Sequence, residues 1–322
     1  MTVYRSLDEA AAHFAPSALT VGNFDGVHVG HRRILRRLKE LGARHGWKPS
    51  VLTFDPHPTR VVAPGRAPRL ITTPDRRAAL VAEEGIEQVL ILPFTRELAQ
   101  VPAEEFVKLL VDRLGARAVL VGDNFRFGHR QSGNVQMLQE LGEKLGYITE
   151  IIPAVICRGR IVSSSAIRES VTAGRVAAAA RLLHRHYELE GRVVSGRGVG
   201  SRQTVPTLNL ETGSDLIPTL GVYITRTRDL ADGREFDSIT NIGYRPTFGQ
   251  SDQLSIETFL LTPLTGATPQ HIRVEFLWRV REERKFESPE ALKAQIMKDV
   301  AAAQRYFRRV KTWLGRIPCT SS

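Results

Sequence analysis

Apolar residues along the first half of the chain fall into two alternating patterns. Short runs rich in β-branched residues predict buried strands, and these runs are Leu19–Asn23, Ser50–Phe54, Gln88–Leu92, Ala118–Val121 and Tyr147–Ile152. Between them, apolar residues recur at helical spacing, as in 34–41 and 106–114. Because strands that alternate with helices form βαβ units, the pattern from Ser17 to Leu183 predicts a parallel sheet with helices. Ligands of such sheets bind at the carboxyl ends of the strands.

The second half has a different pattern, in which strands follow one another with Gly and Pro between them. The predicted strands are Glu188–Val194, Thr207–Glu211, Gly221–Arg226, Ser238–Ile242, Leu254–Leu261 and Ile272–Val280. This succession predicts a small antiparallel β-barrel. Ser288 and Pro289 then supply an N-cap and a first helical residue. The closing helix has one apolar face, formed by Leu292, Ile296, Val300, Phe307, Val310 and Leu314.

The change of pattern at His184–Tyr187 predicts the domain organisation. Residues 1–184 form one domain, residues 185–316 form a second, and residues 317–322 form a short tail. A chain of 322 residues is long for one domain and comfortable for two. Its hydrophobic fraction of 42% and charged fraction of 25% are ordinary for a globular protein, so each domain has enough apolar residues for a core.

The formal net charge of +11 attracts nucleic acids, membrane surfaces and small polyanions such as ATP alike. Lys and Arg are scattered along the chain, which favours a nucleotide over a nucleic acid. Cys157 and Cys319 are too few for a disulfide framework or a cysteine-ligated metal. There is no signal-peptide pattern, and no run reaches the roughly 18 apolar residues of a membrane span. We therefore expect a cytoplasmic protein with neither a membrane nor a nucleic-acid partner.

The segment Val21–His31, VGNFDGVHVGH, is the strongest candidate for a site. A strand ends there in a glycine-bearing turn and a helix begins, so free backbone amides and the helix dipole create an anion site. His28 and His31 share a helix face and can reach one phosphate chain together. Gly30 would let the backbone approach a nucleotide closely. A plain turn with surface histidines is one alternative. A zinc site is another, without an HExxH motif or a third ligand at fixed spacing.

Three further segments lie in loops of the predicted α/β domain. The run 162–168, VSSSAIR, offers hydroxyls, free amides and Arg168 at a helix start, which is a second phosphate-binding set. An ordinary N-cap at Ser164 is the alternative. The segments 53–58, TFDPHP, and 122–128, GDNFRFG, follow the second and fourth predicted strands. A rigid proline turn and core phenylalanines are the alternatives for these two loops.

In this order and spacing, the four segments resemble the FMN adenylyltransferase module of bacterial bifunctional FAD synthetases, within the nucleotidyltransferase superfamily that carries HxGH and SSxxIR motifs. The resemblance implies a Rossmann-like domain in which FMN attacks the α-phosphorus of ATP and pyrophosphate leaves. It implies an ATP site of Gly22, Phe24, Asp25, His28, Gly30, His31, Ser164, Ser165 and Arg168, with His28 and His31 catalytic. It implies an FMN site of Pro56, His57, Pro58, Asp123, Asn124 and Phe125. Many relatives have Asp where Asn124 stands, and either side chain can hydrogen-bond a ligand.

The resemblance continues through the second half, where segments 191–196, 206–209, 241–248 and 256–258 are similar to the riboflavin kinase module of the same enzymes. It implies that ATP and riboflavin bind at Gly196, Thr207, Asn209, Glu257 and Arg281, that Thr207 and Asn209 serve Mg²⁺, and that Glu257 is the catalytic base. Strand alternation places Glu257 on the face of Phe259 and Leu261, where apolar neighbours would raise its proton affinity. The alternatives are a Glu257 that faces solvent and an Asn209 that is a turn residue. Arg281, Glu283 and Phe286 could likewise only anchor the terminal helix.

One loop departs from the family pattern. Relatives usually carry Gly-Arg-x-x-Gly-aromatic before Pro-Thr, whereas this chain has GSRQTV at 200–205. Thr204 replaces a glycine, the arginine is absent or displaced to Arg202, and Leu208 replaces the usual alanine. We expect this loop to alter the rate or the nucleotide affinity of the kinase half.

The resemblance predicts an enzyme that converts riboflavin and ATP to FMN and ADP, and then FMN and ATP to FAD and pyrophosphate. Its partners are riboflavin, FMN, FAD and ATP, with Mg²⁺ as cofactor and with weak self-association. Two alternatives stay open: a nucleotidyltransferase for another phosphorylated substrate, and a basic RNA-binding protein without ATP turnover. The barrel argues against the first. No KMSKS-like loop or aromatic RNA platform supports the second.

Overall fold

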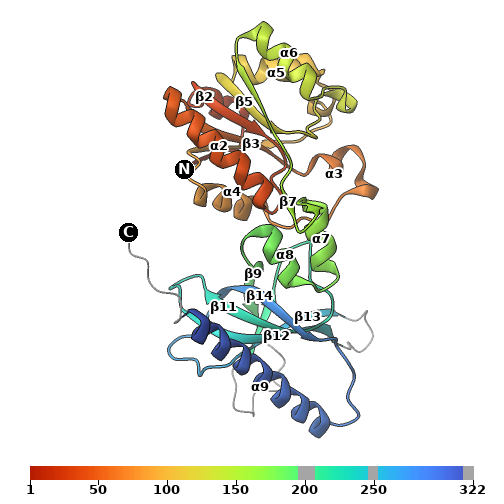
Figure 1. Cartoon of the computed structure of the whole chain (residues 1–322). Helices are drawn as coiled ribbons and strands as arrows, with labels where there is room; N and C mark the ends of the chain where they lie inside the picture. The colour runs from red at the N-terminus through yellow and green to blue at the C-terminus, as the bar shows by residue number, and fades with distance from the viewer. Residues whose placement is uncertain (195–206, 246–252, 315–322) are drawn as a thin grey trace. The chain divides into compact units, whose positions relative to one another are not determined.

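The computed structural model describes residues 1–194, 207–245 and 253–314. The chain divides into two compact units, Met1–Ala166 and Ile167–Ser322 (Figure 1). The division lies within one helix, and the predicted domain boundary at 184/185 stays a prediction. Within the described ranges, no helix is both long enough and apolar enough to cross a bilayer.

The first unit is built on a parallel sheet. Its strands are β1 (Thr2–Tyr4), β2 (Ser17–Val21), β3 (Lys48–Asp55), β4 (Gln88–Pro93), β5 (Ala116–Gly122) and β6 (Ile148–Ile152). Their order is β1-β4-β3-β2-β5-β6, and all neighbours pair in parallel. The five predicted strands and the α/β class are confirmed. β1 was not predicted because three residues carry no readable alternation.

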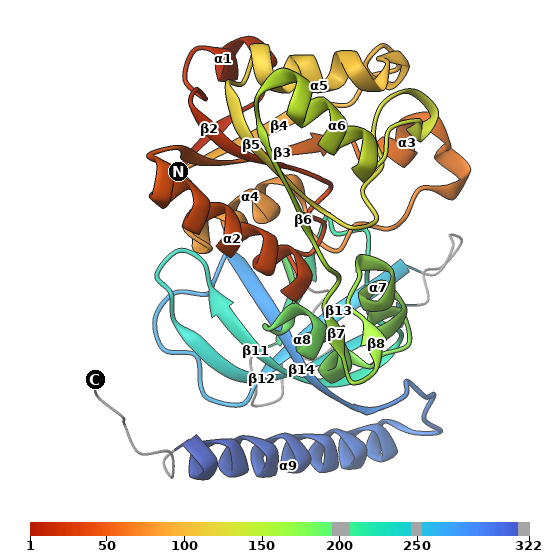
Figure 2. The ribbon, with the colours of Figure 1, turned by 45° about the horizontal axis from the view of Figure 1, so that its top comes forward.

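Helices cover both faces of this sheet. The α-helices are α1 (Leu7–Ala11), α2 (Val29–His45), α3 (Pro58–Val62), α4 (Pro74–Glu83), α5 (Ala103–Asp112) and α6 (Val135–Leu145), with short 3-10 turns η1 (Pro64–Arg66), η2 (Leu98–Gln100) and η3 (His129–Gln131). Residues of α2 and α4 pack with Ala18, Val51 and Val89 on one face. Residues of α1, α5 and α6 pack with Leu19 and Leu52 on the other. Figure 2 shows α2 and α4 on the side opposite α5 and α6.

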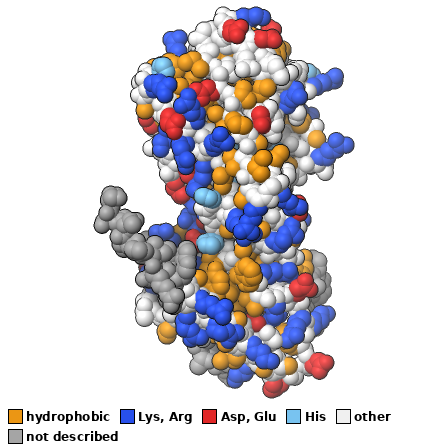
Figure 3. All heavy atoms as spheres, in the orientation of Figure 1, with side chains coloured by type: hydrophobic (Ala, Val, Ile, Leu, Met, Phe, Trp, Pro, Cys, Tyr) orange, Lys and Arg blue, Asp and Glu red, His pale blue; other side chains and the backbone are white. Residues whose placement is uncertain are grey.

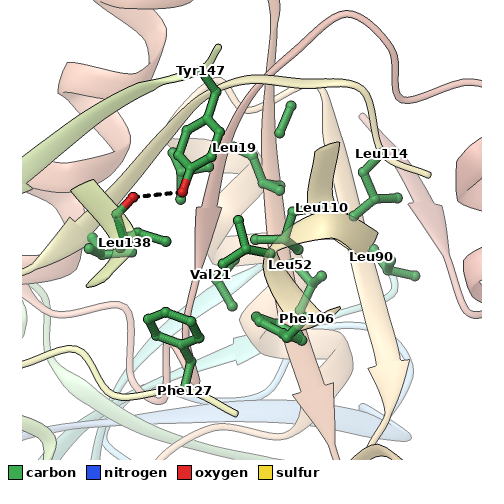
Figure 4. Packing of buried hydrophobic residues seen from close by; sticks show 14 of the residues in the cluster. Leu19, Val21, Leu52, Leu90, Phe106, Leu110, Leu114, Phe127, Leu138 and Tyr147 are labelled. Carbon is green, nitrogen blue, oxygen red and sulfur yellow. Dashed lines mark hydrogen bonds between the residues drawn. The ribbon is translucent and has the colours of Figure 1, made fainter. Parts of the chain in front are cut away.

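The apolar layer under α5 and α6 is closed by one buried polar contact. Tyr147 lies immediately before β6, and its hydroxyl donates to the carbonyl of Leu138 over 2.7 Å (Figure 4). Burial raises the pKa of Tyr147 to about 12, so this donor keeps its proton at any physiological pH. The contact joins α6 to the edge of the sheet within the core cluster that also contains Leu138 and Leu141.

After β6 the chain forms a two-stranded hairpin, β7 (Ile156–Cys157) with β8 (Arg160–Ile161), and enters α7 (Ser164–Thr172). The division between the units falls within α7, at Ala166/Ile167. A further helix, α8 (Val176–Leu183), packs against the strands of the second unit.

The second unit is the predicted antiparallel barrel. Its strands are β9 (Tyr187–Val194), β10 (Thr207–Glu211), β11 (Gly221–Asp229), β12 (Glu235–Arg245), β13 (Gln253–Leu260) and β14 (His271–Arg281). They close in the order β10-β13-β12-β11-β14-β9. The terminal helix α9 (Pro289–Leu314) packs Ala303 and Phe307 against Val222, Ile224 and Ile239 on the outer face of the barrel. The predicted cap is confirmed, because the Ser288 hydroxyl accepts from the backbone N–H of Ala291 at 3.2 Å.

A row of hydroxyl groups crosses the interior of this barrel. The Thr225 hydroxyl contacts those of Ser238 (2.9 Å) and Thr240 (2.8 Å), and Thr240 contacts Thr258 (2.9 Å). All four residues are fully buried. Each polar group therefore obtains its partner from a neighbouring strand, which makes a hydroxyl interior tolerable.

Candidate functional sites

A cavity of about 1180 Å³ lies in the first unit, among the loops that follow β2, β3, β4, β5 and β6. This is the carboxyl edge of the parallel sheet, where ligands of such sheets bind. Most predicted residues line it: Gly22, Phe24, His28, Gly30, His31, His57, Pro58, Asp123, Asn124, Phe125 and Ser164. Four others are not among its lining residues, namely Asp25, Pro56, Ser165 and Arg168. The sequence segments that were predicted to act together thus share one cavity.

His28 and His31 form the start of α2. His28 is the N-cap residue, and its Nδ1 accepts a hydrogen bond from the backbone N–H of His31 at 3.3 Å. The two rings stack with centroids 3.7 Å apart. A Cβ on Gly30 would lie 3.1 Å from the His28 ring, so a side chain at this position would crowd the histidine.

His31 carries the clearest electrostatic perturbation of the site. Burial, the charge of His28 and the charge of Arg77 together hold the pKa of His31 well below its ordinary value. Its Nδ1 is buried and has no hydrogen-bond partner among the described residues. A neutral imidazole with an uncommitted nitrogen beside a cavity is suited to meet an incoming anion.

The turn between β2 and α2 has an unusual backbone. Phe24 (φ 47°) and Val27 (φ 39°) both adopt left-handed conformations, which are costly for an aromatic and a β-branched residue. The Asp25 carboxylate accepts from the N–H groups of Ile71 (3.0 Å) and Thr72 (3.1 Å) and from the Thr72 hydroxyl (3.2 Å). Asp25 is 1% exposed, so its buried carboxylate stabilises the turn through these hydrogen bonds.

The serine run meets this turn directly. The Ser164 hydroxyl donates to the carbonyl of Asp25 over 2.9 Å. The interpretation of Ser164 as an N-cap is wrong, because it is the Ser163 hydroxyl that accepts from the backbone N–H of Ala166 at 3.2 Å. Ser165 lies in the first turn of α7, and Arg168 lies four residues beyond Ser164 in the part of α7 that belongs to the second unit.

The two other predicted loops, 53–58 and 122–128, contribute a histidine, two aromatic rings and an aspartate. His57 caps α3, with its Nδ1 accepting from the N–H of Thr59 at 3.2 Å, and Pro56 and Pro58 flank it. Phe125 stacks with Phe127 at 5.5 Å between centroids. Both rings line the cavity. Phe127 is buried in the core, as the alternative held, and Phe125 is half-buried and packs against the same core cluster. Asp123 accepts from the N–H of Ala154 at 3.1 Å, so it also orders the loop after β6.

Sequence reasoning missed several cationic residues of this cavity. Arg96, Arg126, His129 and Arg130 line it from the loops after β4 and β5. Their position after predicted strands was the available signal, and it was not used. The positive charges of Arg96, Arg126 and Arg130 make the cavity favourable for a polyanion. On the face drawn in Figure 3, Lys and Arg side chains are otherwise spread among acidic and apolar ones.

The second candidate site lies on the outer face of the barrel. Asn209 on β10 and Asn241 on β12 are both directly opposite Glu257 on β13, and directly opposed residues point to the same face. Thr207 is opposite Phe259 in the same pairing. Leu208 and Leu210 alternate with these residues and are buried. The strands therefore bring Thr207, Asn209 and Glu257 to one face.

Glu257 is half-buried, and its Oε1 accepts from the Ser255 hydroxyl at 3.0 Å. Phe259 and Leu261, which were predicted to share its face, pack against the cluster under α9. Glu257 therefore does not simply face solvent, which was the alternative considered for it. Glu283 lies against Gly243, and burial raises the pKa of its carboxyl group.

Arg281 has a structural set of contacts. Its guanidinium binds the buried carboxylate of Asp299 on α9, with Nη2 and Nε at 2.8 and 3.0 Å from Oδ2. It also lies 5.6 Å from the ring centroid of Phe286. These contacts anchor the terminal helix, which was the alternative considered for Arg281. Gly196, the departing loop 200–205 with Arg202 and Thr204, and residues 246–248 lie outside the described residues.

Comparisons with known proteins cover both units. The FAD synthetase family model matches residues 10–166, and the riboflavin kinase family model matches residues 183–307. A bifunctional riboflavin kinase/FMN adenylyltransferase from Pseudomonas fluorescens is 36% identical over 94% of this chain and 97% of its own length. The chain belongs to this bacterial family. The relative of the same description from Escherichia coli K12 is 34% identical, over 91% of this chain and 93% of the relative.

The predicted family and both predicted enzyme activities are confirmed by these matches. A solved structure of a macrolide-efflux protein from Streptococcus pneumoniae has a TM-score of 0.83 and covers 94% of this chain and 99% of its own. At 22% identity this likeness establishes the fold alone.

ATP-dependent kinases and adenylyltransferases of this kind are expected to use a divalent metal. No group of three or more His, Cys, Asp or Glu side chains in the described ranges could hold a metal ion. The hydroxyl of Thr207 and the amide oxygen of Asn209 are hard oxygen donors on one face of the barrel. They suit a cation held largely by substrate phosphates and water.

Proposed function

We propose that the cavity of the first unit transfers the adenylyl group of ATP to FMN, and that the Glu257 face of the barrel phosphorylates riboflavin. The observation that carries the first assignment is the hydrogen bond between Ser164 and the carbonyl of Asp25. Through it, two separate anion-binding segments, one at each helix start, face the same cavity.

In adenylyl transfer, an oxygen of the FMN phosphate forms a bond to the α-phosphorus of ATP while the bond from that phosphorus to the bridging oxygen breaks. Pyrophosphate carries away the electron pair, and the attacking phosphate oxygen has no proton to lose. The protein therefore needs to position and to stabilise charge. We assign that task to His28 and His31 at the start of α2, with Ser164 at the start of α7.

FMN would occupy the part of the cavity lined by the loops after β3 and β5. Phe125 offers an apolar surface for a planar ring, and Asn124 offers an amide that can donate and accept. His57 and Pro58 line the same cavity from the other loop. The roles predicted for Asp25, Pro56, Ser165 and Arg168 remain proposals, because none of these four lines the cavity.

In the barrel, Glu257 would accept the proton of the ribityl 5′-hydroxyl as its oxygen attacks the γ-phosphorus of ATP and ADP leaves. The Ser255 hydroxyl holds one oxygen of Glu257 and thereby orients the base. Thr207 and Asn209 would hold Mg²⁺, which when bound neutralises charge on the ATP phosphates. Gly196 and Arg281 are proposed to complete this site.

The test is to incubate the purified protein with ATP, Mg²⁺ and either riboflavin or FMN, and to separate the flavins by chromatography. FMN should appear from riboflavin and FAD should appear from FMN, with ADP and pyrophosphate as the respective co-products. Chelation of the metal should stop both reactions, and Mg²⁺ should restore them. A protein that makes no FAD from FMN, or binds RNA salt-sensitively without ATP turnover, would contradict the proposal.

A further inference from the structure

Arg77 on α4 is the largest fully buried side chain of the described residues, with 1% of its surface exposed. A buried guanidinium is expensive unless its charge and its donors are used. Burial lowers the pKa of Arg77, and the charges of Asp25 and Asp55 oppose this effect. The residue is not a lining residue of the cavity, so any effect on the chemistry must pass through other groups.

Those groups are the ends of two strands. Nη1 of Arg77 donates to the carbonyl of Asn23 (2.9 Å), to the hydroxyl of Thr53 (2.9 Å) and to the carbonyl of Phe54 (3.2 Å). The Thr53 hydroxyl in turn donates to the carbonyl of Asn23 at 3.1 Å. One nitrogen thus joins the end of β2 to the end of β3, immediately before the turn 23–27 and the loop 55–58.

Ile71 and Thr72, which lie shortly before Arg77 in the sequence, also bind the turn 23–27. Asp25 accepts from the backbone of Ile71 and Thr72, and the N–H of Gly26 donates to the Thr72 hydroxyl at 3.1 Å. Ile71, Thr72 and Arg77 therefore form hydrogen bonds with both ends of the turn 23–27. Left-handed conformations such as those of Phe24 and Val27 persist only where the surroundings over-determine them.

We propose that Arg77 is a positioning residue for adenylyl transfer, which holds the turn 23–27 and the loop 55–58 in the relative geometry that the two substrates need. This inference rests on the proposed function of the first unit. The guanidinium does so with one nitrogen, since its Nε and Nη2 have no hydrogen-bond partner among the described residues. The charge of Arg77 also contributes to the lowered pKa of His31.

The decisive variants are Arg77→Met, which removes the donors and the charge, and Arg77→Lys, which keeps the charge. In Arg77→Met, kcat for FMN adenylylation should fall about 10- to 100-fold, because misplacement of reacting groups by about an ångström has effects of that size. The KM for ATP should change by less than about threefold. Arg77→Lys should recover part of the loss. Riboflavin phosphorylation, measured in the same samples, should change by less than about twofold in both variants.

Arg113→Met is the matched control, since Arg113 is a surface arginine of the same unit that pairs with Asp8. It should leave both activities unchanged. If folded Arg77→Met adenylylates FMN at the wild-type rate, or loses both activities equally, the inference is wrong. If Arg77→Met does not fold, Thr53→Val decides: it removes one of the three acceptors, and wild-type adenylylation in that variant would also overturn the inference.

A second readout does not depend on activity. The pKa of His31, followed by NMR of labelled histidine, should rise in Arg77→Met and stay low in Arg77→Lys, because only the first variant removes the nearby cation. An unchanged His31 titration in Arg77→Met contradicts the inference. Failure of the wild-type protein to make FAD would instead contradict the proposed function, so the two failures can be told apart.

Discussion

The imidazole of His28 caps the helix that carries His31, and the two rings lie face to face with centroids 3.7 Å apart. Burial of His31, and after it the repulsion between two imidazolium ions at this separation, lowers the pKa of His31 and favours its neutral form. A phosphate chain that binds to the pair would reverse this preference, because a nearby negative charge stabilises the charged ring.

Binding of pyrophosphate should therefore take up protons near pH 7. The pKa of His31 starts well below its ordinary value and rises in the complex, so the complex holds more protons than the free protein. Calorimetry in two buffers of different ionisation enthalpy measures this uptake. His31→Gln should reduce it. Wild-type binding without any proton uptake would contradict the assignment of His31 to the phosphate chain.

The ligand-free protein should lose stability as the pH falls. The folded protein favours neutral His31, whereas the unfolded chain protonates this residue near pH 6.5. The unfolded state thus binds more protons, and stability declines below about pH 6.5, toward the folded-state pKa. Thermal melts of the wild type and of His31→Gln across that range check this, and the variant should show the flatter dependence. Equal slopes would show that His31 is not the group responsible.

His28→Ala should stop the pathway at FMN. The substitution removes the N-cap acceptor and one of the two stacked rings, so we expect adenylylation to fall by about 10²-fold or more. Riboflavin phosphorylation should persist. His45→Ala, at the exposed end of the same helix, is the control and should retain both activities. Flavin chromatography after incubation with riboflavin and ATP gives the result.

Glu257→Gln should have the complementary effect. Loss of the base should slow FMN formation by about 10²- to 10⁴-fold, while supplied FMN is still converted to FAD. Glu235→Gln, at an exposed position of β12, is the matched substitution and should leave the kinase rate unchanged. Loss of both reactions in a folded Glu257→Gln protein would contradict the division of labour between the two units.

Thr240→Val should destabilise the barrel without touching either site. Its hydroxyl contacts those of Thr225 and Thr258, and the substitution leaves both with one partner fewer in a dry interior. We expect a loss of about 1–3 kcal/mol in the free energy of unfolding. Thermal or urea denaturation measures it, with exposed Thr262→Val as the control. A wild-type melting temperature in Thr240→Val would show that the hydroxyl row contributes little.

Periodicity sufficed to predict the sheet, the barrel and the closing helix, because each depends on long apolar patterns. The motif order likewise led to the cavity in which His28, His57, Asn124 and Ser164 meet. It could not show how those motifs are held. Arg77 stands in a polar stretch, PDRR, that looks like a solvated helix start, and its burial depends on the carbonyl of Phe54, a residue 23 positions away in the sequence.

The sequence also could not predict the direction in which a side chain points. Asp25 belongs to the motif, yet its carboxylate points to the backbone of 71–72, away from the residues that line the cavity. Arg281 was predicted for the kinase site, yet it binds Asp299 on α9. In both cases the partner lies in a part of the chain that the local pattern does not mention, and only the tertiary fold brings the two together.

The closed barrel determines how a flavin can approach Glu257. The inner faces of its strands are filled by buried residues, from Tyr187 and Tyr223 to Phe276 and the hydroxyl row, so a tricyclic ring has no room between them. Under the proposed function, phosphorylation of riboflavin then belongs to the outer surface, where Thr207 and Asn209 on β10 lie beside Glu257 on β13. We therefore expect riboflavin and ATP to bind and leave at the outer surface, without entering the interior of the barrel.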